Sequence, residues 1–88
     1  MSKRFDLGRI VATAGVHNTM EEHPDFKDFV RESFIRYCCG DWGDTNPDDA
    51  KLNDESAEND ERILAVYKND KYIIWIITEW DRSRTTIL

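Results

Sequence analysis

Two apolar runs near the end of the chain, four residues apart, place the strongest constraint on the fold. Residues 62–67 read RILAVY and residues 72–78 read YIIWIIT, and neither run alternates polar with apolar positions. Such runs are typical of strands that are covered on both faces or lie centrally in a sheet. Residues 69–70 (ND) tolerate positive φ, so we expect a two-residue hairpin turn there that pairs Tyr67 with Tyr72.

Helices are predicted ahead of these runs. After Pro24, apolar side chains recur at steps of three and four residues, which predicts a helix of about four turns that ends at Gly40. The sequence NPDD repeats the same start signal and predicts a helix over residues 47–58, with two acids at the positive end of its dipole. The apolar face of this helix is poor, so we expect it on the surface. Residues 16–22 are expected to form one or two helical turns.

These elements are expected to form one α+β domain over residues 1–88. Residues 7–13 (LGRIVAT) mix β-branched and small side chains and predict a short strand, and residues 84–88 predict another. We therefore expect a small antiparallel sheet made of the C-terminal hairpin, this third strand and the N-terminal strand, with two to three helices on one face. At 88 residues, folding buries only about 60% of the surface of the unfolded chain. This size excludes a deep catalytic cleft between two lobes.

Acidic charge is concentrated in one segment. Residues 41–61 hold nine acids and one base, whereas the other 67 residues hold nine acids and eleven bases. The segment is either a solvated face or a surface that imitates nucleic acid and gains fast, salt-sensitive association with a basic groove. Trp42 is either a lid on the core or an anchor for a partner. The predicted partner-binding residues are Asp41, Trp42, Asp44, Asp48, Asp49, Asp54, Glu55, Glu58 and Trp80.

Basic residues near the two ends of the chain form an alternative site. They would converge into one basic corner if the first and last strands are neighbours. Such a corner would bind nucleic acid, as in a small regulatory or toxin–antitoxin-type module, although the net charge of −6 disfavours contacts with phosphates. The residues of this alternative nucleic-acid-binding corner are Lys3, Arg4, Arg9, Arg82 and Arg84.

The sequence offers little support for catalysis or metal binding. Glu79 and Asp81 flank Trp80 and could share a metal on one side of a strand, but Asp81 equally suits the capping of a turn. The adjacent Cys38 and Cys39, with two histidines six residues apart, match no standard zinc spacing. We expect Cys38 in the core and Cys39 at a helix end. We therefore expect a protein that is not an enzyme and that has no cofactor and no metal.

Three blocks of sequence stand out together. They read LGRIVATAG at residues 7–15, GDWGD at residues 40–44 and IWIITEWDRSRTTIL at residues 74–88. Their order and separation resemble a group of small bacterial proteins carried on plasmids and other mobile elements, with the patterns LGxIVATxG, SGDWG and IWIITExDRSxTTIL. Cys39 stands where the group usually has serine. The resemblance brings no activity, but it implies a habitat in which small proteins act on host defence, replication or transfer.

Together these patterns lead to one expected function. We expect a non-enzymatic protein of a mobile element that inhibits a host nucleic-acid-targeting defence complex, of the anti-CRISPR or anti-restriction type, through its acidic surface. The expected partner is a host defence protein or ribonucleoprotein complex, without direct contact with nucleic acid or a membrane. A homodimer through an exposed strand at residues 84–88 is left open. No membrane-length apolar run and no signal peptide are apparent, so we expect a cytoplasmic protein.

Overall fold

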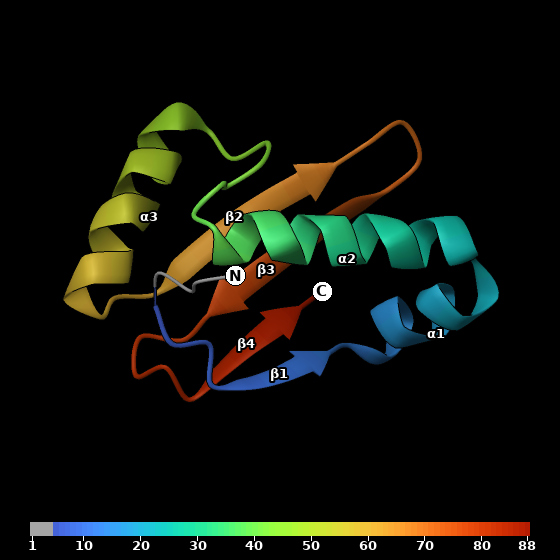
Figure 1. Ribbon diagram of the computed structural model, residues 1–88, viewed down its shortest axis with the longest axis horizontal. Coiled ribbons are helices and arrows are strands. Elements are labelled where there is room, and N and C mark those ends of the chain that lie inside the picture. The colour runs from blue at the N-terminus through green and yellow to red at the C-terminus, as the bar shows by residue number, and fades with distance from the viewer. Residues whose placement is uncertain (1–4) are drawn as a thin grey trace.

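The computed structural model describes residues 5–88 and has an α+β fold around a four-stranded sheet (Figure 1). In chain order the elements are β1 (Arg9–Ala12), α1 (Ala14–Glu22), α2 (Pro24–Cys38), α3 (Pro47–Asn59), β2 (Ile63–Lys68), β3 (Ile73–Thr78) and β4 (Arg84–Ile87). The strand order is β1-β4-β3-β2. The α+β class is confirmed. The sheet is mixed, where an antiparallel sheet was expected, because β1 pairs with β4 in parallel.

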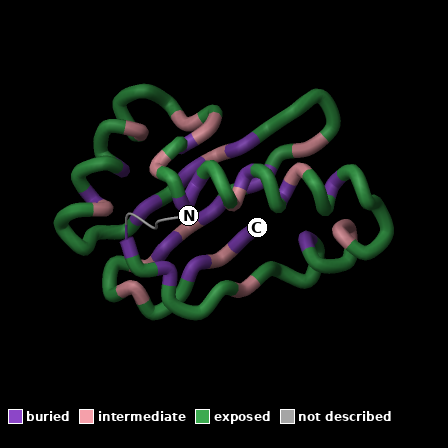
Figure 2. Tube along the Cα trace, viewed as in Figure 1, coloured by how far each residue is buried: buried purple, intermediate pink, exposed green. Residues whose placement is uncertain are grey.

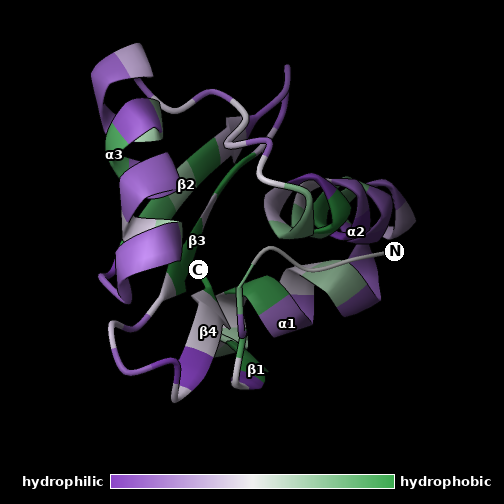
Figure 3. Cartoon of the chain, turned by 60° about the vertical axis from the view of Figure 1, so that its left-hand side comes forward, coloured by the Kyte–Doolittle hydropathy of each residue, from purple (hydrophilic) through white to green (hydrophobic). Residues whose placement is uncertain are grey.

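The helices lie on different sides of the sheet. Helix α2 crosses one face with α1 packed against it, whereas α3 packs against β2. Figure 3 shows α2 and α3 on opposite sides of the β2–β3 hairpin. The core lies between α2 and the sheet, as the buried stretches in Figure 2 show. Its largest fully buried side chains are Tyr37, Tyr67, Ile63, Ile74, Ile76, Thr78, Thr85 and Ser33.

The predicted helices form where their start signals lie. Helix α2 begins at Pro24, and α3 begins at Pro47 after the Asn46 side chain, which accepts a hydrogen bond from the backbone N–H of Asp48 at 2.9 Å. A capping side chain and proline at the first helical position are signals that act within one turn. No helix among residues 5–88 is long and apolar enough to cross a membrane.

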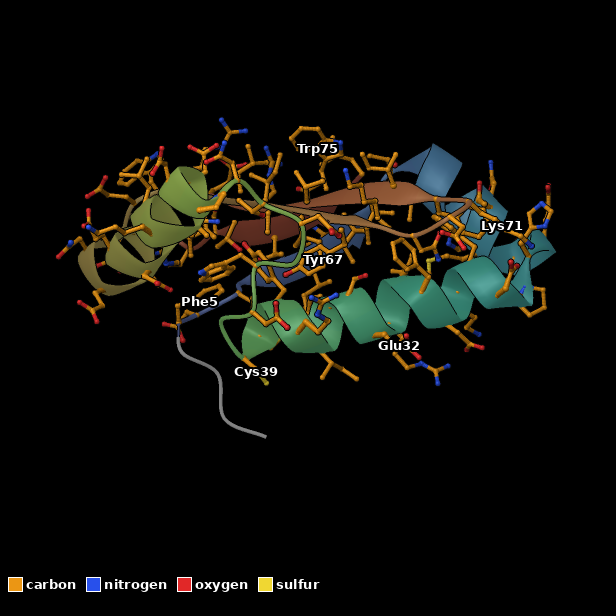
Figure 4. All side chains as sticks on the ribbon, turned by 90° about the horizontal axis from the view of Figure 1, so that it is seen from above. Phe5, Glu32, Cys39, Tyr67, Lys71 and Trp75 are labelled. Atoms are coloured by element: carbon orange, nitrogen blue, oxygen red, sulfur yellow. The ribbon has the colours of Figure 1, made fainter. Side chains whose placement is uncertain are left out.

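The second face of the sheet is open. Of the two alternatives for the apolar runs, cover on both faces is therefore wrong, and a central place in the sheet is confirmed for β3 but not for β2, which is an edge strand. Side chains of β2 and β3 alternate between buried and exposed positions. Ile73 is 56% exposed and Trp75 is 40% exposed. Figure 4 shows Tyr67 on the side of the sheet that faces α2 and Trp75 on the other side. The apolar runs fail to alternate because large apolar residues occupy the open face as well as the core face.

The hairpin turn lies one residue later than predicted. Tyr67 pairs with Ile74 and not with Tyr72, and the backbone N–H of Asn69 donates to the carbonyl of Tyr72 at 2.9 Å. The side-chain oxygen of Asn69 accepts hydrogen bonds from the backbone N–H groups of Lys71 and Tyr72. Asn69 therefore takes the first position of the turn, where its side chain closes an Asx turn. The observed pairing partner of each residue lies two positions from the predicted one. Because side chains alternate between faces, the same side chains remain on the core face.

A chain of buried hydroxyl groups ties four segments together. The hydroxyl of Thr85 donates to the carbonyl of Leu7 at 2.7 Å, and it lies 2.8 Å from the hydroxyl of Thr78. Because Thr85 uses its single proton on the carbonyl, Thr78 is the donor to Thr85. The hydroxyl of Tyr37, 2.7 Å from that of Thr78, is then the donor to Thr78. Burial raises the pKa of Tyr37 and so keeps its hydroxyl protonated, which the hydroxyl needs in order to donate to Thr78.

Candidate functional site

The acidic segment, residues 41–61, closes the outer edge of β2. The backbone N–H of Val66 donates to the hydroxyl of Thr45 at 3.0 Å. The side-chain amide of Asn53 donates to the carbonyl of Leu64 at 2.8 Å and accepts from its N–H at 3.3 Å. The Asn53 side chain therefore pairs with the backbone of β2 as a residue of a neighbouring strand would. This contact explains the poor apolar face of α3, because the helix packs against backbone groups of an edge strand that would otherwise stay unpaired.

Three of the seven predicted partner-binding acids have structural roles. The carboxylate of Asp41 accepts a hydrogen bond from the guanidinium of Arg36 at 2.8 Å. The carboxylate of Asp44 accepts one from the backbone N–H of Lys68 at 2.9 Å. The carboxylate of Asp54 accepts one from an indole N–H at 2.9 Å. These acids hold the acidic segment against the sheet and α2.

Trp42 is the lid on the core. Its side chain is only 5% exposed, and its ring packs edge-on against Tyr37 with 5.4 Å between ring centroids. Phe5 packs on it as well, at 6.0 Å. The indole N–H is the group that donates to Asp54. Trp42 therefore offers no surface to a partner, and the structure favours the core interpretation over the anchor.

Replacing Asp41 by asparagine should reduce stability at neutral pH but not in acid. The hydrogen bond from Arg36 lowers the pKa of Asp41, so the stabilisation is present above the unfolded pKa of about 4 and is lost as the pH falls through the lower pKa of the folded state. Both side chains are about half exposed, at 52% and 47%, so we expect a loss of less than about 1 kcal/mol at pH 7. Urea unfolding at pH 7, 4 and 2.5 measures it.

The exposed Asp70→Asn in the hairpin turn is the control for this experiment. The difference in unfolding free energy between the wild type and Asp41→Asn should shrink below pH 4. A difference that stays constant down to pH 2.5 would show that the pair with Arg36 does not stabilise the fold.

The other acids of the segment form one exposed ridge on α3 and just beyond it. The sequence included two of them, Asp60 and Glu61, in the acidic segment but left them out of the predicted surface. Figure 3 shows α3 as largely hydrophilic along its length. We call this set the acidic ridge; its residues, all exposed, are Asp48, Asp49, Glu55, Glu58, Asp60 and Glu61.

Trp80 lies beside the end of the acidic ridge. It is 66% exposed, in the turn between β3 and β4. Arg82 in the same turn donates hydrogen bonds to the carbonyls of Ser56 at 2.8 Å and Glu61 at 2.7 Å. These bonds fix the turn against the C-terminal end of α3. The turn that carries the exposed Trp80 is thus held at the C-terminal end of α3.

Among residues 5–88, two residues of the basic corner, Arg9 and Arg84, remain exposed. The prediction of this corner required the first and last strands to be neighbours. They are, because β1 pairs with β4 and Arg9 lies opposite Arg84. The Arg82 side chain is only 9% exposed and is used by the backbone carbonyls that it binds. Lys3 and Arg4 lie outside the described residues. The two exposed guanidinium groups in the described part of this corner are few compared with the six to ten phosphates that a nucleic-acid-binding protein can contact.

The remaining candidate residues have structural explanations. The carboxylate of Asp81 accepts a hydrogen bond from the backbone N–H of Ser83 at 3.0 Å, which lowers the pKa of Asp81 and caps the turn. Glu79 is half-buried beside this turn. Among residues 5–88, no three His, Cys, Asp or Glu side chains are grouped so that they could hold a metal ion. Cys38 is buried and Cys39 is exposed at the C-terminal end of α2, as expected.

Comparisons of the chain with models of protein families, with curated proteins and with solved structures found no match. The arguments that follow therefore depend on the fold and the side chains described above.

Proposed function

We propose that the protein inhibits a host nucleic-acid-targeting defence complex, of the anti-CRISPR or anti-restriction type, by occupying a basic groove with its acidic ridge. The observation that carries the proposal is that the acids of the acidic segment fall into two sets, one that holds the segment in place and one that forms the ridge. Asp41, Asp44 and Asp54 hold the segment on the sheet, whereas six further exposed carboxylates lie on α3 and just beyond its C-terminal end. A solvated face needs no such concentration of charge, since the rest of the chain is close to neutral.

The density of charge on the ridge is similar to that of nucleic acid. Helix α3 has 13 residues and is therefore about 20 Å long. One strand of DNA carries about six phosphates over that length. The ridge has six carboxylates over a comparable length. Asp48, Glu55 and Glu58 share the outward side of the helix, at 100° per residue, with Lys51, the one base of the segment. A rigid helix with this spacing suits a groove built for phosphates.

The mechanism is competition without catalysis. The field of the ridge steers the protein to the basic groove, so the association rate should fall steeply with ionic strength. Trp80 adds an apolar contact at the end of the ridge, where a tryptophan gives much binding energy for few ordered torsions. The resemblance to proteins of mobile elements supports a cytoplasmic partner, either a host defence protein or a ribonucleoprotein complex.

Neutralising the outward side of the ridge should abolish inhibition. The test is phage plating on strains with active CRISPR or restriction immunity, with and without the protein. We expect the wild type to restore plaques against one system. We expect Asp48→Asn, Glu55→Gln and Glu58→Gln, combined in one variant, to lower plating at least tenfold, because three of the six contacts are lost.

The matched control carries Glu22→Gln, Asp28→Asn and Glu32→Gln, which remove the same charge from exposed positions on α1 and α2. It should inhibit like the wild type. Circular dichroism and thermal unfolding confirm that both variants fold. Full inhibition by the folded ridge variant, or no rescue by the wild type against any system, would overturn the proposal.

A further inference from the structure

We propose that the open face of the sheet, the side opposite α2, is the interface of a symmetric homodimer. Large apolar side chains gather on this face. Val66 pairs with Trp75 across β2 and β3, and the backbone groups of Leu88 and Trp75 exchange hydrogen bonds of 2.9 Å and 2.7 Å. The exposed or half-buried apolar residues of this face and of the adjoining flank of α3 include Leu52, Leu64, Ile73, Trp75, Ile77 and Leu88.

Helix α3 forms a wall along one side of the open face. Residues of α3 and the open-face residues Leu64, Val66 and Trp75 line one hollow of about 500 Å³. A helix is about 10 Å in diameter, and two stacked sheets lie about 10 Å apart. The flank of α3 that lines the hollow can therefore pack into the space between two open faces, and we expect it to lie over β1 and β4 of a second copy.

Charge on the two sides of the open face is complementary. On the α3 side, the hollow is lined by the acids Asp49 and Glu61 together with Arg62. On the far side, Arg9 and Arg84 lie next to each other in register on β1 and β4, and both are exposed. One side of the face is therefore mainly acidic and the other is basic.

This arrangement selects one symmetry. A two-fold axis parallel to the strands, between the two sheets, places the acidic wall of each copy over the basic side of its partner. An axis across the strands would place wall against wall and bring like charges together. A two-fold interface must be self-complementary, and only the first arrangement satisfies both the shape and the charge.

The area is sufficient for a weak dimer. Four strands of four to six residues cover roughly 300 Å² in projection, and the flank of α3 adds about 200 Å². Two copies then bury at least about 1,000 Å², the area that a specific interface has to reach. Pairing through the edge of β2 or through residues 84–88 is less suitable. The backbone of β2 is closed by the acidic segment, and residues 84–88, expected as an exposed edge, lie between β1 and β3.

Sedimentation equilibrium between about 1 and 500 μM tests the proposal. We expect a mass that rises from 10.4 kDa toward twice that value with concentration. Trp75→Ala should weaken dimerisation at least tenfold, because Trp75 lies at the centre of the interface. Trp80→Ala is the matched control. It removes another exposed tryptophan outside the open face and should leave the dimer unchanged.

A charge exchange tests the symmetry. Arg84→Glu should weaken the dimer at least tenfold at low salt, and adding Asp49→Arg to the same chain should restore most of the affinity. Arg31→Glu, on the exposed side of α2, controls for net charge. A mass of 10.4 kDa at every concentration, a dimer insensitive to Trp75→Ala, or an Arg84→Glu effect no larger than that of Arg31→Glu would overturn the proposal. None of these outcomes depends on the inhibitory function.

Discussion

Replacing Trp42 by alanine should lower the free energy of unfolding by about 3–5 kcal/mol. Trp42 is buried at the junction of α2, α3 and the segment before β1, where its ring packs edge-on against Tyr37. The change leaves a cavity in a small core and removes the N–H donor from the Asp54 carboxylate. Urea unfolding followed by circular dichroism measures the loss.

Two further variants separate the contributions to this loss. Trp42→Phe keeps an aromatic ring but has no indole N–H, so it should lie between the wild type and Trp42→Ala. Trp80→Ala, at an exposed position, should change stability by less than about 0.5 kcal/mol. Equal effects of Trp42→Ala and Trp80→Ala would contradict the placement of Trp42 as the lid on the core.

Replacing Gly43 by alanine should cost about 3 kcal/mol or more. Gly43 has a φ of +65°, and a Cβ there would lie 2.4 Å from the ring of Tyr67. Tyr67 is fully buried, and its hydroxyl donates to the carbonyl of Asp41 at 2.6 Å, so its ring has no room to move. Both the backbone strain and the steric overlap therefore remain in the folded variant. Thermal and urea unfolding give the size of the effect.

Gly15→Ala is the control for this prediction. A Cβ at Gly15 meets no atom within 4 Å, and the residue lies near the start of α1. Alanine is the better helix former, so this change should be neutral or stabilising by up to about 1 kcal/mol. If Gly43→Ala were as stable as Gly15→Ala, the close approach of the acidic segment to β2 would be wrong.

The block GDWGD is explained by the fold. Asp41 binds Arg36, Trp42 covers the core, and Gly43 allows the close approach to Tyr67. Asp44 accepts from the backbone of β2. The block that stands out in the sequence therefore positions α3 and its acidic ridge, and the ridge is where we propose that the partner binds.

The two proposals use different sides of α3. Its outward side carries Asp48, Glu55 and Glu58, whereas Asp49 and Leu52 face the hollow on the open face. A dimer through the open face would thus leave the outward side of both helices exposed. Such a dimer would present the outward acids of two ridges, although Asp49 and Glu61 would lie in the dimer interface. Binding of both outward sides to one complex would raise the apparent affinity.

The sequence by itself determined the helix starts and the presence of the strands. Proline with a capping side chain at Asn46, apolar spacing after Pro24 and the two apolar runs act over a few residues, so they need no knowledge of distant contacts. It also placed the acidic charge in one segment.

Only the tertiary structure decided which of these exposed acids accept hydrogen bonds from the rest of the protein. Asp54 meets the indole of Trp42 from 12 positions away, and Arg82 meets the carbonyl of Ser56 from 26 positions away. The open face was likewise decided by where α2 and α3 pack, because an apolar run looks the same whether one or both of its faces are covered. The use of a charged or apolar side chain depends on partners that are distant in sequence, and the chain brings those partners together only when it folds.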